Sequence, residues 1–156
     1  MTRQEFISGV EHSQRSLRRF LASLCMGDTR LAEDIAQETY MKAYMASEKF
    51  KNPEKFKFWV FKIAYNTFLT HKRDIKHEWD LSEAKSIKAE TNEEPFQYET
   101  LYQALASLSE RERTAVSLFY LEGYASKEIA TLLDISDDAV RQAIGRGRKR
   151  LKTLIR

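Results

Sequence analysis

The 156-residue sequence has few residues that form tight turns or covalent cross-links, with 5 Gly, 2 Pro and 1 Cys. So few turn formers, beside 31% charged residues, exclude the many hairpins of an all-β sandwich or barrel. The single Cys25 excludes an internal disulfide, and the three His show no metal-ligand spacing with it or with each other. We therefore expect no metal and no other cofactor.

Long apolar runs are also missing from the sequence. None approaches the roughly 20 residues that a membrane-spanning helix needs, and the segment from Met1 to Gly9 lacks the apolar core of a signal peptide. We therefore expect a cytoplasmic protein with no direct membrane insertion. The length allows one ordinary domain or two small ones.

Charge divides the chain into three blocks. Residues 1–73 hold 13 basic and 8 acidic residues, residues 74–99 hold 3 and 8, and residues 100–156 hold 10 and 7. The acidic block is the most polar part of the chain and has no sustained helical stripe. We predict two small helical domains, residues 1–74 and 100–156, joined by an acidic linker at residues 75–99. The alternative is a poorly patterned helix within one continuous domain.

Apolar periodicity predicts three amphipathic helices in the first block. Gly27-Asp28-Thr29 ends the first helix and caps the second, which runs to about Met45. After a basic loop from Glu48 to Lys51, Asn52-Pro53 is typical of the start of a third helix. The residues predicted to be buried are Phe6, Ile7, Val10, Leu17, Phe20, Leu21 and Leu24, then Leu31, Ile35, Thr39, Ala43 and Tyr44, then Phe56, Trp59, Val60, Ile63, Ala64 and Thr67.

The last block predicts a helix-turn-helix domain. Ser109 to Glu112 forms a capping box for a helix that ends at Leu121, before Glu122-Gly123-Tyr124. A shorter helix from Ser126 to Leu133 and a longer one from Asp137 follow. This layout is typical of a reader of duplex DNA, and the alternative is a two-helix packing unit with a solvated basic end. The inward residues predicted for the last helix are Val140, Ile144, Leu151 and Leu154.

The last predicted helix carries side chains suited to DNA. Arg can read guanine and Gln adenine in the major groove, and from residue 141 onward there are seven basic residues and no acidic ones. Basic side chains bind phosphates without sequence preference. The predicted groove-facing residues are Asp138, Arg141, Gln142 and Gly145, and the predicted phosphate contacts are Arg146, Arg148, Lys149, Arg150 and Lys152.

Two faces in the first block each allow two interpretations. On the second helix a polar and acidic face suits a basic protein partner, or is an ordinary solvated face. On the third helix a row away from the core stripe, with Phe61 at its border, places aromatic residues among lysines. Such aromatics stack on single-stranded nucleic acid, or belong to the core as most do. The first face is Asp34, Gln37, Glu38 and Met41, and the row is Phe58, Lys62, Tyr65, Leu69 and Lys72.

These segments resemble bacterial sigma factors of the extracytoplasmic-function class, the smallest promoter-recognition subunits of RNA polymerase. The stretch from Asp28 to Tyr44, with AEDIAQETY at residues 32–40, is similar to that family's polymerase-binding helix. FWVFKIAYN at residues 58–66 is similar to the helix that melts and holds the −10 promoter element. YLEGY at residues 120–124, followed by SKEIA at 126–130, is similar to the domain that reads the −35 element. The three motifs stand in the family's order and cover most of the chain.

The resemblance implies an all-α protein without catalytic residues that binds core RNA polymerase and promoter DNA, with an anti-sigma factor as its inhibitor. It implies initiation at a restricted set of promoters in response to a stress or envelope signal. The acidic linker would pass toward the RNA exit path of the polymerase. Base preference is not carried over, because Asp137-Asp138, Ala143, Gly145 and Gly147 depart from the family pattern. Each of the two glycines is expected to weaken its helix by up to about 1 kcal/mol.

The resemblance also implies a role for each predicted site. Acidic and polar residues of the second helix would grip a basic coiled coil of the largest polymerase subunit. The loop at residues 50–55, with Lys62, Tyr65 and Asn66, would hold a base flipped out of the non-template strand. The full sets are Asp34, Gln37, Glu38 and Met41 for polymerase; Phe50, Lys51, Lys55, Phe58, Lys62, Tyr65, Asn66 and Lys72 for the −10 element; and Ser126, Asp138, Arg141, Gln142, Gly145, Arg146, Arg148 and Lys149 for the −35 element.

Two other classes of function stay open from the sequence alone. A stand-alone helix-turn-helix repressor or activator, with N-terminal helices that sense a ligand or dimerise, would bind duplex DNA without polymerase. An all-helical enzyme is disfavoured, because the chain has no Gly-rich phosphate loop, no paired His and carboxylate motif and no nucleophile elbow.

Overall fold

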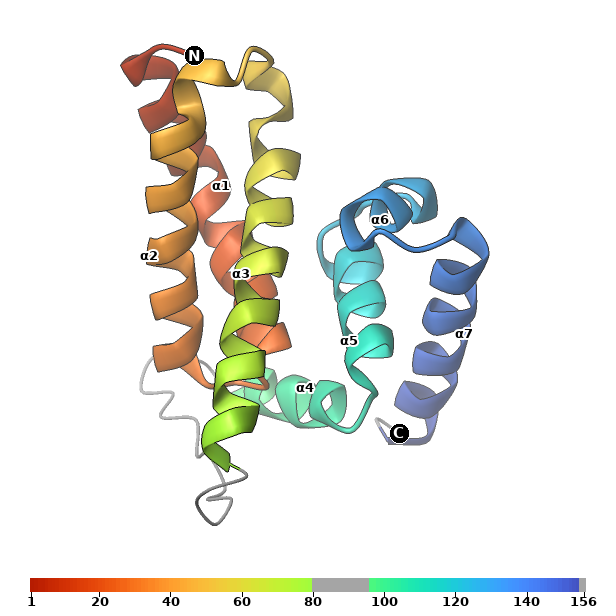
Figure 1. Ribbon diagram of the computed structural model, residues 1–156. Helices are drawn as coiled ribbons and strands as arrows, with labels where there is room; N and C mark the ends of the chain where they lie inside the picture. The colour runs from red at the N-terminus through yellow and green to blue at the C-terminus, as the bar shows by residue number, and fades with distance from the viewer. Residues whose placement is uncertain (80–95, 155–156) are drawn as a thin grey trace.

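The computed structural model describes residues 1–79 and 96–154, and these residues form helices and no strand. Three long helices, α1 (Arg3–Leu24), α2 (Thr29–Ala46) and α3 (Phe56–Trp79), make an N-terminal bundle that runs down, up and down in Figure 1. Two short 3-10 turns, η1 (Ser47–Lys49) and η2 (Pro53–Lys55), connect α2 to α3. The predicted all-α class is confirmed.

The described C-terminal residues, 96–154, contain four further helices. They are α4 (Phe96–Ala106), α5 (Glu110–Val116), α6 (Ser126–Leu133) and α7 (Asp137–Leu154), and a π-helical segment, η3 (Ser117–Leu121), extends α5. In Figure 1, α4 crosses below the bundle and α5 to α7 stand beside it. Both ends of the predicted linker are therefore helical, whereas residues 80–95 lie outside the described residues.

Local chemistry explains where the helices begin. The Asp28 carboxylate accepts from the Leu31 amide at 3.1 Å and caps α2, after a turn in which Met26 and Gly27 have positive φ angles of 55° and 87°. The predicted capping box is present at α5, where the Ser109 hydroxyl accepts from the Glu112 amide and the Glu112 carboxylate accepts from the Ser109 amide. Pro53 opens η2 rather than α3 itself.

The turn of the helix-turn-helix unit is built by Asp134 and Ser136. Asp134 ends α6 in the left-handed conformation, with φ 58° and ψ 48°, and the Ser136 hydroxyl accepts from the Ala139 amide at 3.1 Å to cap α7. The chain therefore reverses between Leu133 and Asp137, as the sequence predicts.

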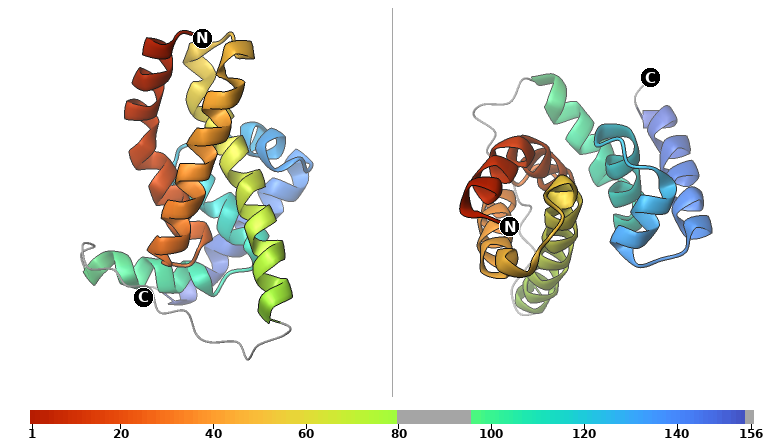
Figure 2. Two further views of the ribbon diagram at one scale, coloured as in Figure 1. Left: turned by 60° about the vertical axis from the view of Figure 1, so that its left-hand side comes forward. Right: turned by 90° about the horizontal axis from the view of Figure 1, so that it is seen from above.

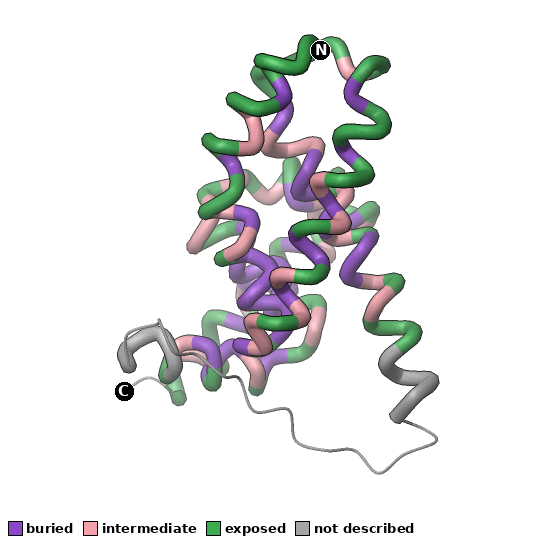
Figure 3. Tube along the Cα trace, turned by 90° about the vertical axis from the view of Figure 1, so that its left-hand side faces the viewer, coloured by how far each residue is buried: buried purple, intermediate pink, exposed green. Residues whose placement is uncertain are grey.

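One apolar core runs through both parts of the molecule. In the bundle, Phe20 of α1 stacks on Phe61 of α3 with ring centroids 5.0 Å apart. The same cluster of buried residues continues into Ile129 of α6 and Val140 of α7. Figure 3 shows the buried stretches where helices face one another and the exposed stretches on their outer sides. The two parts are thus packed against each other.

Three residues predicted to be buried are exposed. Ile7 is 41% exposed, Tyr44 is 56% exposed and Leu154 is 54% exposed. All three lie near helix ends, where neighbouring helices no longer cover the apolar stripe. Tyr44 keeps one edge against Phe6, with ring centroids 5.2 Å apart.

Across the described ranges, residues 1–79 and 96–154, no helix combines the length and the apolar character that crossing a membrane requires.

Candidate polymerase and nucleic-acid interfaces

The polar face predicted on α2 exists and is open. Asp34, Gln37 and Met41 are exposed, and Met41 keeps 65% of its surface accessible. In Figure 1, α2 stands on the side of the bundle away from α5 to α7. The four predicted residues therefore line one helical face that a partner can reach.

Glu38, the fourth member of this face, is held in place by the side chains of His71 and Lys42. Its carboxylate is 2.9 Å from Nε2 of His71 and 3.0 Å from Nζ of Lys42. Hydrogen bonds from His71 and then from Lys42 keep the pKa of the Glu38 carboxyl below its ordinary value. Glu38 is therefore a fixed negative charge beside the exposed Asp34.

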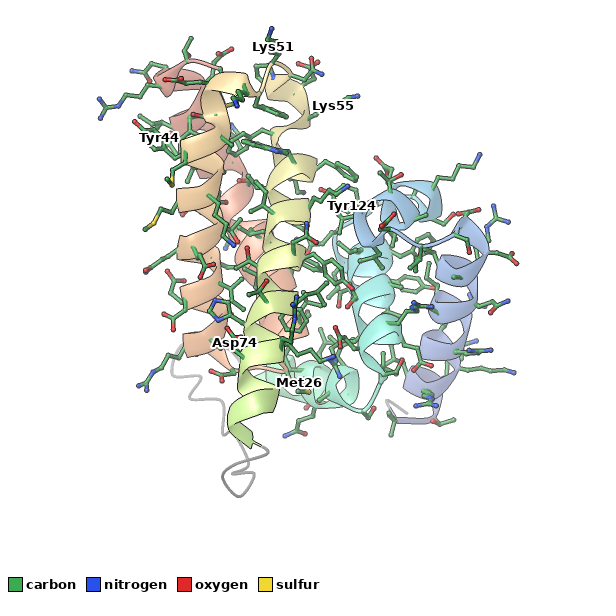
Figure 4. The ribbon with its side chains drawn as sticks, viewed as in Figure 1. Met26, Tyr44, Lys51, Lys55, Asp74 and Tyr124 are labelled. Carbon is green, nitrogen blue, oxygen red and sulfur yellow. The ribbon has the colours of Figure 1, made fainter. Side chains whose placement is uncertain are left out.

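The loop at residues 50–55 combines an anchored ring with two free lysines. Phe50 is half-buried and stacks on Trp59, with ring centroids 4.2 Å apart and planes 7° from parallel. Lys51 and Lys55 are exposed at the end of the bundle and point away from it in Figure 4. Phe50 thus fixes the loop, and the lysines can meet a strand of DNA.

The aromatic row on α3 packs against the core in this arrangement, which agrees with the second of its two interpretations, that these aromatics belong to the core. Phe58, Tyr65 and Leu69 are half-buried against the core, and Phe61 is fully buried. The reason is that the C-terminal part packs on this face, which the spacing along α3 cannot reveal. Burial raises the pKa of the Tyr65 hydroxyl above its ordinary value. Exposed members of the predicted −10 set on α3 are Lys62, Asn66 and Lys72.

Tyr124 is the residue that meets the aromatic row. Its ring lies edge-on to Phe58 and Phe61, with centroids 5.8 and 5.6 Å away, and Figure 4 places it between α3 and α6. Nζ of Lys57 lies 5.9 Å from the Tyr124 ring centroid and 5.7 Å from that of Phe61. Burial raises the pKa of the Tyr124 hydroxyl.

Ion pairs between described residues join the N-terminal and C-terminal parts. The Arg19 guanidinium donates to both carboxylate oxygens of Glu122, at 3.0 and 2.9 Å, and the Glu122 side chain is 0% exposed. The ammonium group of Lys72 pairs with the Glu110 carboxylate. Sequence reasoning missed Arg19 and Glu122, because residues 103 positions apart have no local signal that joins them.

The predicted −35 surface on α7 is open. Asp138, Arg141 and Gln142 are exposed, and Figures 1 and 2 show α7 on the outer side of the C-terminal part. Arg141 pairs with Asp137 at 2.9 Å, one turn earlier on the same helix. Ser126, also in the predicted set, is half-exposed at the first position of α6. A shallow hollow on α7 brings together Gln142, Gly145, Arg146, Arg148, Lys149 and Lys152.

The glycines of α7 have different surroundings. A Cβ at Gly147 would lie 2.6 Å from Cγ2 of Val116 on α5, whereas a Cβ at Gly145 would meet nothing within 4 Å. Gly147 is therefore needed for the close approach of α7 to α5. The sequence predicts that both glycines weaken the helix. Only at Gly145 is there room for a larger side chain that would remove this weakness.

Fold and surface together define an all-helical DNA-reading protein, with a helix-turn-helix unit packed against a three-helix bundle that carries an open polar face. Residues 10–78 match the sequence model of sigma-70 region 2, and residues 98–151 match that of sigma-70, region 4.

Curated relatives and solved structures agree with these matches. The chain is 31% identical to the ECF RNA polymerase sigma factor SigM of Bacillus subtilis, over 87% of this chain and 86% of that protein. It is 30% identical to the RNA polymerase sigma-H factor of Pseudomonas aeruginosa, over 83% and 77%. The sigma factor RpoE of Bartonella quintana, solved in complex with the anti-sigma factor NepR, superposes with a TM-score of 0.87 at 27% identity, covering 97% of each chain.

The chain belongs to the sigma-70 family, as a sigma factor of the extracytoplasmic-function class that directs transcription initiation by RNA polymerase. The presence of both regions in one chain decides against the stand-alone regulator, whose N-terminal helices would sense a ligand or dimerise.

Proposed function

We propose that residues 1–74 bind core polymerase and the −10 element, that residues 100–156 read the −35 element, and that residues 75–99 link the two. One observation supports this division best: the polar face of α2 and the basic face of α7 are both open and lie on opposite sides of the molecule. One protein can therefore contact polymerase and upstream DNA at the same time. Tethering both DNA contacts to one polymerase raises their effective concentration.

The α2 face forms the polymerase contact in this proposal. Its carboxylates, one exposed at Asp34 and one fixed at Glu38, suit a basic helical partner, and the exposed Met41 adds apolar area beside them. Gln37 lies on the same exposed face and supplies a neutral hydrogen-bonding group.

The −10 contact is made by the loop at residues 50–55 and by α3. Lys51, Lys55 and Lys62 are exposed and neutralise phosphates, and Asn66 can hydrogen-bond an unstacked base. A base flipped out of the duplex must be unstacked before it is read, and aromatic rings offer a stacking surface. The full set remains Phe50, Lys51, Lys55, Phe58, Lys62, Tyr65, Asn66 and Lys72.

The −35 contact is made by α7 in the major groove. Arg141 and Gln142 stand in its second turn, where a recognition helix reaches base edges. Lys149 and its basic neighbours bind phosphate. The full set remains Ser126, Asp138, Arg141, Gln142, Gly145, Arg146, Arg148 and Lys149.

The proposed partners indicate where the protein acts and what controls it. The protein acts in the cytoplasm, where polymerase and promoters are, and it positions DNA rather than catalysing a reaction. The similar sigma factor RpoE was solved in complex with the anti-sigma factor NepR, and this supports an anti-sigma factor, answering to a stress or envelope signal, as a further partner.

The polymerase contact is tested by a double substitution, Asp34→Ala with Glu38→Ala. Two lost interface carboxylates cost about 2 kcal/mol or more, so affinity for core polymerase should fall roughly thirtyfold. Affinity is measured by fluorescence anisotropy of the labelled protein titrated with purified core polymerase. Glu11→Ala with Glu48→Ala is the matched control, since both residues are exposed and the charge change is equal.

Unchanged polymerase affinity in the Asp34 and Glu38 variant, or an equal loss in the control variant, would contradict the assignment of α2. The first result would place the polymerase interface on another face of the protein. The second would show that binding depends on the net charge of the protein and not on these two residues.

A further inference from the structure

Two methionines are the most exposed large apolar side chains among the described residues. Met45 is 80% exposed and Met41 is 65% exposed. Both belong to α2 and are four residues apart, so they lie one turn from each other on the same side of the helix. Neither belongs to a buried cluster of the described residues. Packing within the protein therefore does not account for two apolar side chains at these positions.

The methionine pair, Met41 and Met45, continues the polar face of α2. Met41 follows Glu38 by three residues and Gln37 by four, and Met45 comes one turn later. Tyr44 is also exposed, and Figure 4 shows it on the outer side of α2. The proposed polymerase face therefore has carboxylates toward one end of α2 and an open apolar surface with two thioethers toward the other.

Oxidation of the thioethers would change this apolar surface. A lone pair of the methionine Sδ attacks one oxygen of a peroxide, the O–O bond breaks, and an S–O bond forms. The sulfur loses two electrons to the peroxide, and the released hydroxide takes the proton of the transferred oxygen and becomes water. The resulting sulfoxide is polar, and its burial in an apolar contact without a hydrogen-bond donor is unfavourable.

The other sulfur atoms of the chain are less suited to this role. Cys25 is buried, and peroxides react with exposed thiolates rather than with a buried thiol. Met1 is half-buried against the core of the bundle. Met26 is 49% exposed, but it lies in the turn before α2, at the opposite end of that helix from the methionine pair. Met26 is therefore an exposed thioether away from the pair and serves as a matched control.

We propose that Met41 and Met45 form an oxidation site for peroxides, and that their conversion to sulfoxides weakens binding of the protein to core polymerase. The proposal rests on the proposed function, because it assumes that α2 contacts polymerase. Oxidation takes place on the free protein, in which both side chains are open. A methionine sulfoxide reductase reverses it: two thiols are oxidised to a disulfide, and the oxygen leaves as water.

The experiment treats the full-length protein with hydrogen peroxide, removes the peroxide with catalase and measures affinity for purified core polymerase by fluorescence anisotropy. Peptide mass spectrometry locates each sulfoxide. Sulfoxides at Met41 and Met45 should lower the affinity about tenfold. The slope of log affinity against log salt concentration should not change, because oxidation adds no charge. Methionine sulfoxide reductase with dithiothreitol should restore the affinity.

Two variants separate the methionine pair from other effects of peroxide. Met41→Leu with Met45→Leu removes both thioethers, and Met26→Leu removes the control thioether. Each variant is compared with its own untreated sample. Peroxide should leave the affinity of the first variant unchanged and lower that of the second as much as that of the wild type. The helical circular dichroism signal should be the same before and after treatment, because both methionines lie outside the core.

The outcomes distinguish this proposal from the proposed function. Absence of sulfoxide at Met41 and Met45, or an equal loss of affinity in the variant that lacks both, would overturn the oxidation site. Sulfoxides without a loss of affinity, or a loss of helical signal together with affinity, would overturn its effect on polymerase binding. If Asp34→Ala with Glu38→Ala still lowers the affinity, only the oxidation proposal fails. If neither change lowers it, the proposed function fails as well.

Discussion

At the scale of single residues, burial and close approach set the chemistry. Burial raises the pKa of the Cys25 thiol to about 12 and keeps it neutral. Burial lowers the pKa of Arg113. Its guanidinium donates hydrogen bonds to the carbonyls of Leu105 and Leu108 at 3.0 and 2.9 Å and so caps the C-terminal end of α4. Neither residue is exposed for a partner.

Alanine substitutions at the two glycines of α7 should change the stability of the protein in opposite directions. Gly147→Ala forces a methyl group against Val116 and should lower the free energy of unfolding by about 1 to 3 kcal/mol. Gly145→Ala has open space and should raise it by about 0.5 to 1 kcal/mol, because glycine weakens a helix interior. Urea unfolding followed by circular dichroism measures both. Equal effects in the two variants would show that contact with α5 does not constrain α7.

Cys25 predicts a loss of stability in alkali. The thiol ionises near pH 9 in the unfolded chain and near pH 12 in the folded protein. Its contribution to the free energy of unfolding is therefore fully present below pH 9 and is lost as the pH rises from 9 to 12. The limiting slope is about 1.4 kcal/mol per pH unit. Urea unfolding at a series of pH values should show a steeper decline for wild type than for Cys25→Ala. Parallel curves would contradict the assignment.

At the scale of helices, most of the structure could be predicted, because its causes are local. Asp28 and Ser109 cap helices where the sequence places them, and Asp134 turns the chain before Asp137. The covered row on α3 could not be predicted. Phe58 is partly covered by Tyr124, which lies far along the chain, and a helical period gives the face of a residue but not what covers it.

Within α7, two kinds of DNA contact should respond differently to substitution. Lys149→Ala should weaken binding to all promoters alike and reduce the slope of log affinity against log salt concentration by about one. Gln142→Ala should leave that slope unchanged and relax the preference at one base pair of the −35 element. The discrimination against the wrong base at that pair should fall by about 1 to 3 kcal/mol. Affinity of the polymerase holoenzyme for promoter fragments, titrated over a range of salt concentrations, separates the two.

The opposite pattern would exchange the proposed roles of these residues. If Gln142→Ala lowered the salt slope and Lys149→Ala changed the base preference, the register of α7 in the groove would differ from the one proposed.

At the scale of the whole molecule, function depends on how two small helical units are combined. The polar face of α2 and the basic face of α7 are open together, whereas the aromatic row of α3, part of which is proposed to meet the −10 element, packs between the units. The sequence predicts all three surfaces, but their mutual exposure depends on long-range contacts such as Arg19–Glu122. Which of these surfaces is open is therefore a property of the packed molecule.

The role of this protein in promoter-specific initiation is tested most directly by transcription with purified core polymerase, with and without the protein, on a pool of genomic promoter fragments. We expect start sites that depend on the protein and share two spaced DNA elements, and these starts should disappear with the Asp34→Ala and Glu38→Ala variant. No dependent start sites and no association with core polymerase, together with tight binding of the protein alone to duplex DNA, would contradict this role.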